Sequence, residues 1–155
     1  MISTELLRRF PFFNFMDDTQ LKAVAMIAEE LTYEKDELLV EAGKPADHFY
    51  FLIDGSVAYY YHVTTEHDPY YNKDYFISDI NPGEIFGISA LIEPYIFTAT
   101  MRTDKVSRII QINASALRAL CEVDLRLSSG LNRAVAKAAM ERLQLTRVQL
   151  VATKK

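Results

Sequence analysis

The chain has 155 residues, of which 50% are apolar and 25% charged, and its mean hydropathy is −0.02. This length and composition predict one globular domain and exclude a disordered or collagen-like chain. Charges interrupt every apolar run before the roughly 20 residues that a membrane helix needs, and the N-terminus is too charged for a signal peptide. Cys121 is the only cysteine in the sequence, so we expect no internal disulfide and a reducing, cytoplasmic setting.

The net charge of −4 is unevenly distributed along the sequence. From Arg133 onward the chain has six basic residues and one acidic residue, and the preceding residues are strongly acidic. Basic residues that are spread along a helix favour a solvated face over a nucleic-acid site, and an acidic body repels phosphates. The charge pattern therefore gives no support for nucleic-acid binding.

Hydrophobic spacing changes twice along the chain. Residues 1–28 have helical spacing, with a break at Pro11 and an N-cap signal at Asp18-Thr19. Residues 29–113 contain short runs rich in aromatic and β-branched residues, separated by turn signals such as Asp54-Gly55 and Asn81-Pro82-Gly83. Many short strands at regular spacing are typical of a sandwich or jelly roll. We therefore predict one mainly β domain, an antiparallel β jelly roll with flanking helices.

Helical spacing returns after Asn113, with a short helix predicted over 114–123 and a long one over 124–150. The apolar face of the long helix is wider than the stripe of about 100° that packing on one surface requires. We therefore predict that this helix contacts both its own barrel and a second copy of the chain. Arg142 falls within the same stripe. The predicted dimer interface consists of Leu131, Ala134, Val135, Ala138, Ala139 and Leu145.

Two glycine-containing segments of the predicted barrel have a distinctive arrangement. Residues 43–57 contain a glycine, an aromatic-aliphatic strand and a second glycine turn, and residues 81–87 read Asn-Pro-Gly-Glu-Ile-Phe-Gly. With the helices that bracket the barrel, these segments resemble the cyclic nucleotide-binding domain. That domain is the sensor of the catabolite-activator family of bacterial transcription factors and of kinase regulatory subunits. The resemblance extends over nearly the whole chain and implies a non-catalytic regulatory module.

The resemblance also locates a phosphate-binding cassette. In the family, backbone N–H groups at the start of a short helix hold the cyclic phosphate, and an arginine on the next strand adds a charge-assisted bond. A glutamate directly after the Phe-Gly pair accepts the ribose hydroxyl. The candidate cassette positions implied in this sequence are Phe86, Gly87, Ile88, Ser89, Ala90, Phe97 and Thr98.

The two side chains that recognise the nucleotide are absent from this cassette. Ile88 stands where the family has its glutamate, Phe97 stands where it has its arginine, and no basic residue lies between Lys73 and Arg102. Losing these contacts lowers affinity by on the order of 10³-fold. We therefore expect no cofactor and at most weak cyclic nucleotide binding. The pocket, with Tyr59 and Tyr61 as candidate walls, either takes an apolar or aromatic small molecule or is filled by its own side chains.

Three alternatives to a cyclic nucleotide sensor are compatible with parts of the sequence. A scaffold without any ligand would keep the fold and lose the pocket. A cupin-type metalloenzyme needs paired histidines and a carboxylate on barrel strands, whereas His62 and His67, with Glu66 and Asp68, share one predicted loop. A haem-binding sensor would take an axial ligand from His48, His62, His67 or Cys121, but their spacing singles out none of them. We predict no catalytic residue and no metal site.

The partners of the chain follow from the same resemblance. Catabolite-activator relatives carry a helix-turn-helix domain after the long helix, and this sequence reaches Lys155 directly after that helix. We therefore expect no direct DNA binding by this chain and no membrane association. The expected partners are a second copy of the chain and a small-molecule ligand.

Overall fold

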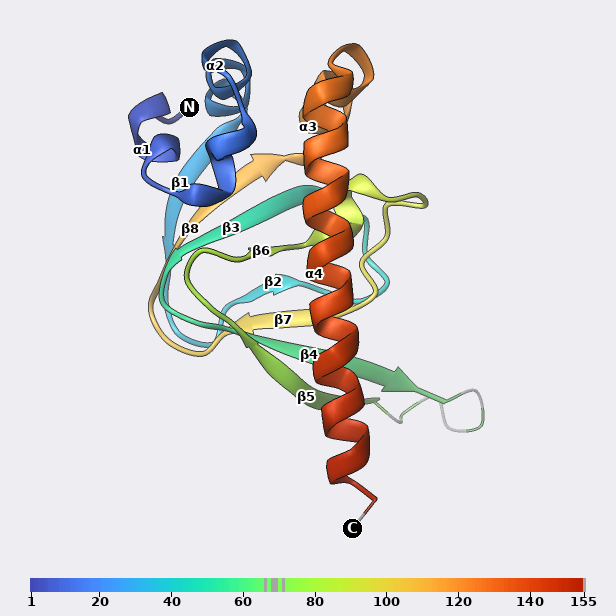
Figure 1. Ribbon diagram of the computed structural model, residues 1–155. Coiled ribbons are helices and arrows are strands. Elements are labelled where there is room, and N and C mark those ends of the chain that lie inside the picture. The colour runs from blue at the N-terminus through green and yellow to red at the C-terminus, as the bar shows by residue number, and fades with distance from the viewer. Residues whose placement is uncertain (66, 68–69, 71, 155) are drawn as a thin grey trace.

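The computed structural model describes residues 1–65, 67, 70 and 72–154. Two four-stranded antiparallel sheets pack into a sandwich. The N-terminal helices lie at one end of this sandwich, and a long C-terminal helix runs along one side of it (Figure 1). The predicted fold class is confirmed. The helices are α1 (Thr4–Arg8), η1 (Pro11–Phe15), α2 (Asp18–Met26), η2 (Ile88–Leu91), α3 (Ala114–Val123) and α4 (Leu125–Ala152). The strands are β1 (Ala28–Tyr33), β2 (Leu38–Val40), β3 (His48–Asp54), β4 (Val57–Thr64), β5 (Asn72–Ile80), β6 (Ile85–Phe86), β7 (Thr100–Thr103) and β8 (Ser107–Asn113).

The strand order is β1-β8-β3-β6 in one sheet and β2-β7-β4-β5 in the other. Ala28, which the sequence places in the helical segment, begins β1 because its backbone pairs with Ile112. Strand β3 is buried along most of its length. The ring of Phe51 on β3 lies 5.2 Å from the ring of Phe13 on η1. Because the N-terminal helices cover this strand on its outer side, it carries a continuous apolar run instead of an alternating one.

Polar side chains define where the helices begin. Asp17 caps α2 in a capping box with Gln20, one residue before the predicted Asp18-Thr19 cap. Asp124 caps α4 and also accepts hydrogen bonds from the Gln20 amide, at 3.0 and 3.3 Å. The hydrogen bond from the Leu127 backbone N–H, together with that from Gln20, lowers the pKa of Asp124. The N-terminus of α4 is therefore hydrogen-bonded to α2, through Asp124 and Gln20.

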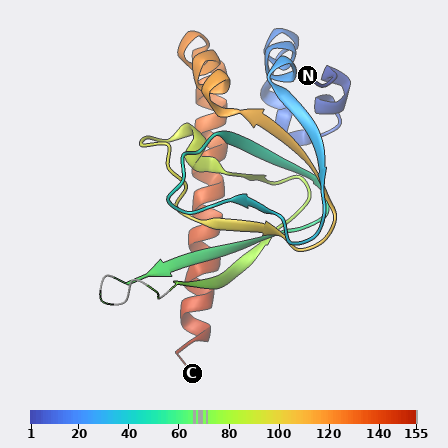
Figure 2. The ribbon, with the colours of Figure 1, turned by 180° about the vertical axis from the view of Figure 1, so that it is seen from behind.

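Helix α4 runs past both sheets, and in the view from behind it lies on their far side (Figure 2). Of the six residues predicted for a dimer interface, four contact the core of the same chain: Leu131, Ala134, Val135 and Ala138. Ala139 and Leu145 are exposed, although Leu145 lies on the side of the helix that faces the barrel. The broad apolar face of the helix therefore divides into a side that packs on the barrel and a side that faces outward. Within the described residues, no helix has the length and apolar character to span a bilayer.

The turn between β3 and β4 requires glycine, and we predict a large effect of replacing it. Gly55 has φ +106°, and a Cβ atom there would lie 2.2 Å from Ser107 Oγ and 2.6 Å from Ser107 Cα. Strain and overpacking together predict that Gly55→Ala destabilises the fold by about 2–5 kcal/mol. Thermal unfolding should show this as a melting temperature lowered by roughly 5–15 °C. Gly43→Ala is the matched control, since Gly43 has φ +86° but no atom within 4 Å of the added Cβ. Equal losses in both variants would contradict the steric explanation.

Candidate functional site

The cassette begins at a tight turn from β6 into η2. Gly87 lies at the N-terminus of η2 with φ +69°. A Cβ atom at this position would lie 2.8 Å from Cδ2 of Tyr50 and 3.2 Å from the carbonyl oxygen of His48. The Tyr50 ring stacks on Phe86 with their centroids 4.7 Å apart. Glycine is therefore required both for the backbone conformation and for the close approach of β3.

The return segment of the cassette is held by backbone hydrogen bonds to the turn at residues 43–44. Phe97 donates to the carbonyl of Lys44 at 3.0 Å and accepts from the N–H of Gly43 at 2.9 Å. Its side chain is only 7% exposed, whereas Thr98 is exposed. Ile88 is partly buried and packs against the core. The side chains of Ile88 and Phe97 therefore both belong to the apolar interior of the cassette segment.

A cavity of about 50 Å³ lies between these two positions. Drug-sized ligands occupy sites of about 300–1,000 Å³, so this space is too small for a nucleotide unless side chains move. Tyr59 lines the cavity, but Tyr61 is exposed and is not part of its wall. Tyr61 shares a strand face with Tyr59, but β4 pairs with β7 only from Val57 to Tyr60, so Tyr61 lies beyond the part of β4 that is paired on both edges. The lining residues are Val40, Tyr59, Gly87, Ile88, Ser89, Phe97, Thr98, Ala99, Met101 and Arg142.

Two arginines connect the cassette to the C-terminal helices. Nη1 of Arg118 on α3 donates to the carbonyl of Ala90 at 2.7 Å, and its guanidinium lies 4.2 Å from the centroid of the Tyr95 ring. Nη2 of Arg142 on α4 donates to the carbonyl of Ile85. Both helices are thus bonded directly to the segment that carries the cassette.

Arg142 lines this cavity, and its position next to the cassette was not predicted from the sequence. Burial lowers the pKa of its guanidinium from the ordinary value, although an arginine remains charged at neutral pH. The only sequence signal was its position in the inward-facing stripe of α4, four residues after Ala138. Placing it at the cassette required knowing which face of the helix packs on the barrel.

The described residues that could serve as metal or haem ligands lie in different parts of the molecule. Nδ1 of His62 lies 2.6 Å from the carboxylate of Asp74, and its Nε2 lies 3.2 Å from the Asn72 side-chain oxygen. Burial raises the pKa of the Cys121 thiol, so the group is protonated and not a ready ligand. In the part of the chain that the structure describes, no group of three or more histidine, cysteine or acidic residues converges. Glu66 and Asp68 lie outside the described residues.

The pair of His62 and Asp74 joins β4 to β5 and predicts a pH-dependent contribution to stability. The hydrogen bond to Asp74 raises the pKa of His62. Since the folded-state pKa is raised, the stabilisation is complete below the ordinary histidine pKa and is lost as pH rises through the folded value. Asp74→Asn should therefore lower the melting temperature by about 1–2 °C more near pH 5.5 than near pH 8.5. The control is His62→Gln, in which this pH dependence should be absent. An equal loss at both pH values would contradict the assignment.

Comparison with known proteins identifies the family. The model of the cyclic nucleotide-binding domain matches residues 30–124. A protein from Geobacter metallireducens GS-15 that is classed as a cyclic nucleotide-binding protein is 34% identical to the chain, with a TM-score of 0.78. The match covers 92% of this chain and 99% of that one. The chain therefore belongs to the cyclic nucleotide-binding domain family, which is typically non-catalytic.

Two further relatives are regulatory proteins. The N-terminal domain of a transcriptional regulator from Streptomyces coelicolor A3(2) is 25% identical, with a TM-score of 0.62, and the match covers 88% of this chain and 93% of that domain. The cAMP-dependent protein kinase regulatory subunit of Dictyostelium discoideum is 24% identical over 118 residues, or 76% of this chain. The match covers 35% of that subunit, so the chain spans about a third of its length.

Proposed function

We propose that this chain is a non-catalytic regulatory module that senses a small molecule without the usual glutamate and arginine pair. Its membership of the cyclic nucleotide-binding family supports the regulatory role. The observation that carries the proposal is the burial of Phe97, which is 7% exposed. The sequence resemblance assigns the family's phosphate arginine to this position. A cyclic phosphate placed there would lose its solvation without gaining a charge-assisted bond. Cyclic nucleotides therefore bind weakly, and no cofactor is required.

A second candidate function is an interaction scaffold that has lost its ligand. The cassette cavity of about 50 Å³, lined by Ile88, Phe97 and Met101 among others, supports this alternative because it is smaller than a small-molecule site. A thermal-shift screen against nucleotides and small aromatic molecules separates the two functions. A sensor is stabilised by at least one class of compound, and a scaffold by none.

The partners that we propose are a second copy of the chain and a small-molecule ligand. Several apolar side chains on the outward side of α4 are exposed, which supports a homodimer formed along this helix. The described residues contain no separate DNA-binding domain, so direct DNA binding by this chain is not part of the proposal. The single cysteine supports a cytoplasmic location.

Titration calorimetry with cyclic AMP and cyclic GMP tests the proposal directly. We expect dissociation constants in the high micromolar range or above for both nucleotides. The reason is that the cassette offers no side-chain cation at position 97 and no acceptor at position 88. A sub-micromolar affinity for either nucleotide would overturn the proposed mode of sensing.

A further inference from the structure

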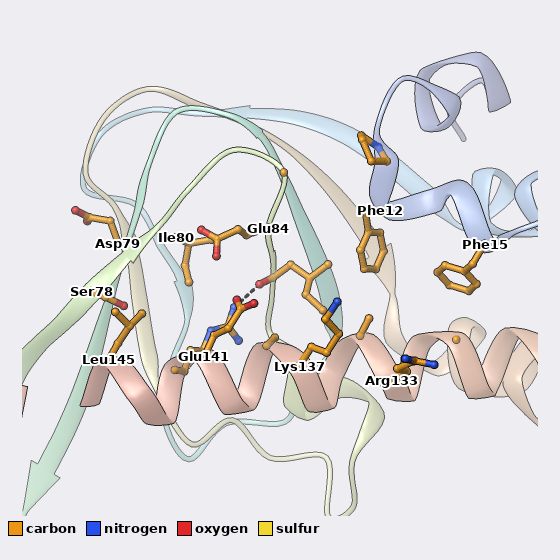
Figure 3. Close-up of a pocket in the computed structure, with 17 residues that line it drawn as sticks. Phe12, Phe15, Ser78, Asp79, Ile80, Glu84, Arg133, Lys137, Glu141 and Leu145 are labelled. Atoms are coloured by element: carbon orange, nitrogen blue, oxygen red, sulfur yellow. Dashed lines mark hydrogen bonds between the residues drawn. The ribbon is translucent and has the colours of Figure 1, made fainter. Parts of the chain in front are cut away.

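A groove outside the cassette lies between α4, the β5–β6 segment and η1 (Figure 3). Its volume is about 490 Å³, which is within the range of about 300–1,000 Å³ for small-molecule sites. Phe12 and Phe15 lie at one end of the groove, and Ser78 and Leu145 lie toward the other. The lining combines apolar side chains with three carboxylates and three cations.

Two buried polar atoms in the described part of the chain have no hydrogen-bond partner, and both belong to residues that line this groove. They are Oγ of Ser78 on β5 and Nη1 of Arg142 on α4. Buried polar atoms are almost always paired, because leaving one unpaired costs its full desolvation energy. Both atoms can donate a hydrogen bond, so together they suit an acceptor that carries negative charge.

The guanidinium of Arg142 makes no ion pair within 4.0 Å in the described residues, although the nearby charges of Glu84 and Glu141 partly offset the effect of burial on its pKa. The ion pairs found there join Arg8 to Asp18, His62 to Asp74 and Arg108 to Glu30. Two carboxylates, Glu84 and Glu141, line the groove with Arg142, but neither lies within ion-pair distance of it. The Glu84 carboxylate accepts from the backbone N–H of Asn81 at 2.6 Å. Arg142 is partly buried and its Nη1 has no hydrogen-bond partner, so an anion that accepts from Nη1 would stabilise the guanidinium beyond what the two carboxylates provide.

We propose that this groove binds a small amphipathic monoanion, a carboxylate on an aromatic or apolar body. Arg142 and Ser78 donate to the carboxylate, and the body extends along α4 toward Phe12. Ala134, which lines the same groove, precedes Arg142 by eight residues, or about 12 Å of helix. A dianion such as a phosphate monoester is disfavoured, because Asp79, Glu84 and Glu141 line the same space and the cations Arg133 and Lys137 are exposed.

This site is distinct from the cassette, although the two share one residue. Arg142 lines both the groove and the small cassette cavity, and it bonds to Ile85 immediately before the cassette turn. An anion that draws the guanidinium into the groove therefore changes a contact of the cassette. The inference does not require the cassette to bind a nucleotide, so each can fail without the other.

Binding of a matched pair of probes to the full chain tests the inference. The probes are 6-phenylhexanoate and the uncharged 6-phenylhexanamide, followed by calorimetry and by amide chemical shifts of α4 and β5. We expect the acid to bind at least about 10-fold more tightly than the amide, since a charge-assisted hydrogen bond distinguishes them. Equal affinities, or shifts confined to residues outside the groove, would overturn the proposal.

Variants assign the effect to the two unpaired atoms. Arg142→Met should lower the affinity for the acid about 10-fold or more and leave the amide unchanged, and Ser78→Ala should have a smaller effect in the same direction. Arg147→Met is the matched control, since Arg147 is an exposed arginine on the same helix and does not line the groove. Without ligand, Arg142→Met should melt at or above the temperature of the unmodified chain, because it removes a buried unpaired charge. An equal loss in Arg147→Met would contradict the assignment.

A cassette variant separates this site from nucleotide binding. Ile88→Glu combined with Phe97→Arg changes the cassette and should retain the affinity for 6-phenylhexanoate. If that variant lost the acid as completely as Arg142→Met, the probe would be bound in the cassette and the groove assignment would be wrong.

Discussion

Cyclic AMP should bind about 10²- to 10³-fold more tightly to a variant that carries both Ile88→Glu and Phe97→Arg than to the unmodified chain. The glutamate would accept the ribose hydroxyl, and the arginine would donate to the cyclic phosphate. Each hydrogen bond to a charged group contributes about 1.5–3 kcal/mol. The second exchange also removes a buried ring from a cavity of only about 50 Å³. Titration calorimetry with cyclic AMP measures the gain directly.

The same segment provides the control for this experiment. Ile92 and Ile96 are exposed, so Ile92→Glu combined with Ile96→Arg makes equivalent exchanges outside the cavity. That control should leave the affinity unchanged. A gain in both variants would point to a general electrostatic effect, and no gain in the cassette variant would show that positions 88 and 97 are not the recognition positions.

The fold was predictable because its strongest signals are local. A glycine with positive φ is needed wherever a turn demands it, and Gly55 and Gly87 both occupy such turns. These turns need no knowledge of distant contacts, so a single sequence was sufficient for the fold. The assignment of Ile88 and Phe97 to the family's glutamate and arginine positions rests on the spacing from Gly87 to Thr100 and stays a prediction.

The walls of the cavity and the groove were not predictable in the same way. Tyr61 shares a strand face with Tyr59, as the alternation predicts, but it lies one residue beyond Tyr60, where the pairing of β4 with β7 ends. On α4, small or apolar residues occur on both sides, at Ala134 and Ala138 as well as Ala139. Which side packs on the barrel depends on the shape of the sandwich, and the position of Arg142 depends on the same packing.

That division of α4 changes which residues should hold a dimer together. Exposed residues on its outward side recur at alternating steps of three and four: Ala136, Ala139, Leu143, Thr146 and Leu150. Met140 adjoins this stripe. Such spacing is the seam of a two-stranded coiled coil between like helices, and a monomer would leave its apolar surface in water. We expect the unmodified chain to sediment as a dimer at tens of micromolar.

Met140→Glu combined with Leu143→Glu should convert this dimer to a monomer without unfolding the chain. The two side chains are 71% and 50% exposed, so they make little contact with the barrel, and the added carboxylates would face their own copies across the two-fold axis. Leu131 or Val135 would not serve here, because each is buried in the core of its own chain. Met26→Glu combined with Val106→Glu adds the same charge at exposed positions outside α4 and should remain dimeric. Sedimentation equilibrium distinguishes the outcomes, and an unmodified chain that is monomeric at tens of micromolar would refute the coiled-coil interface.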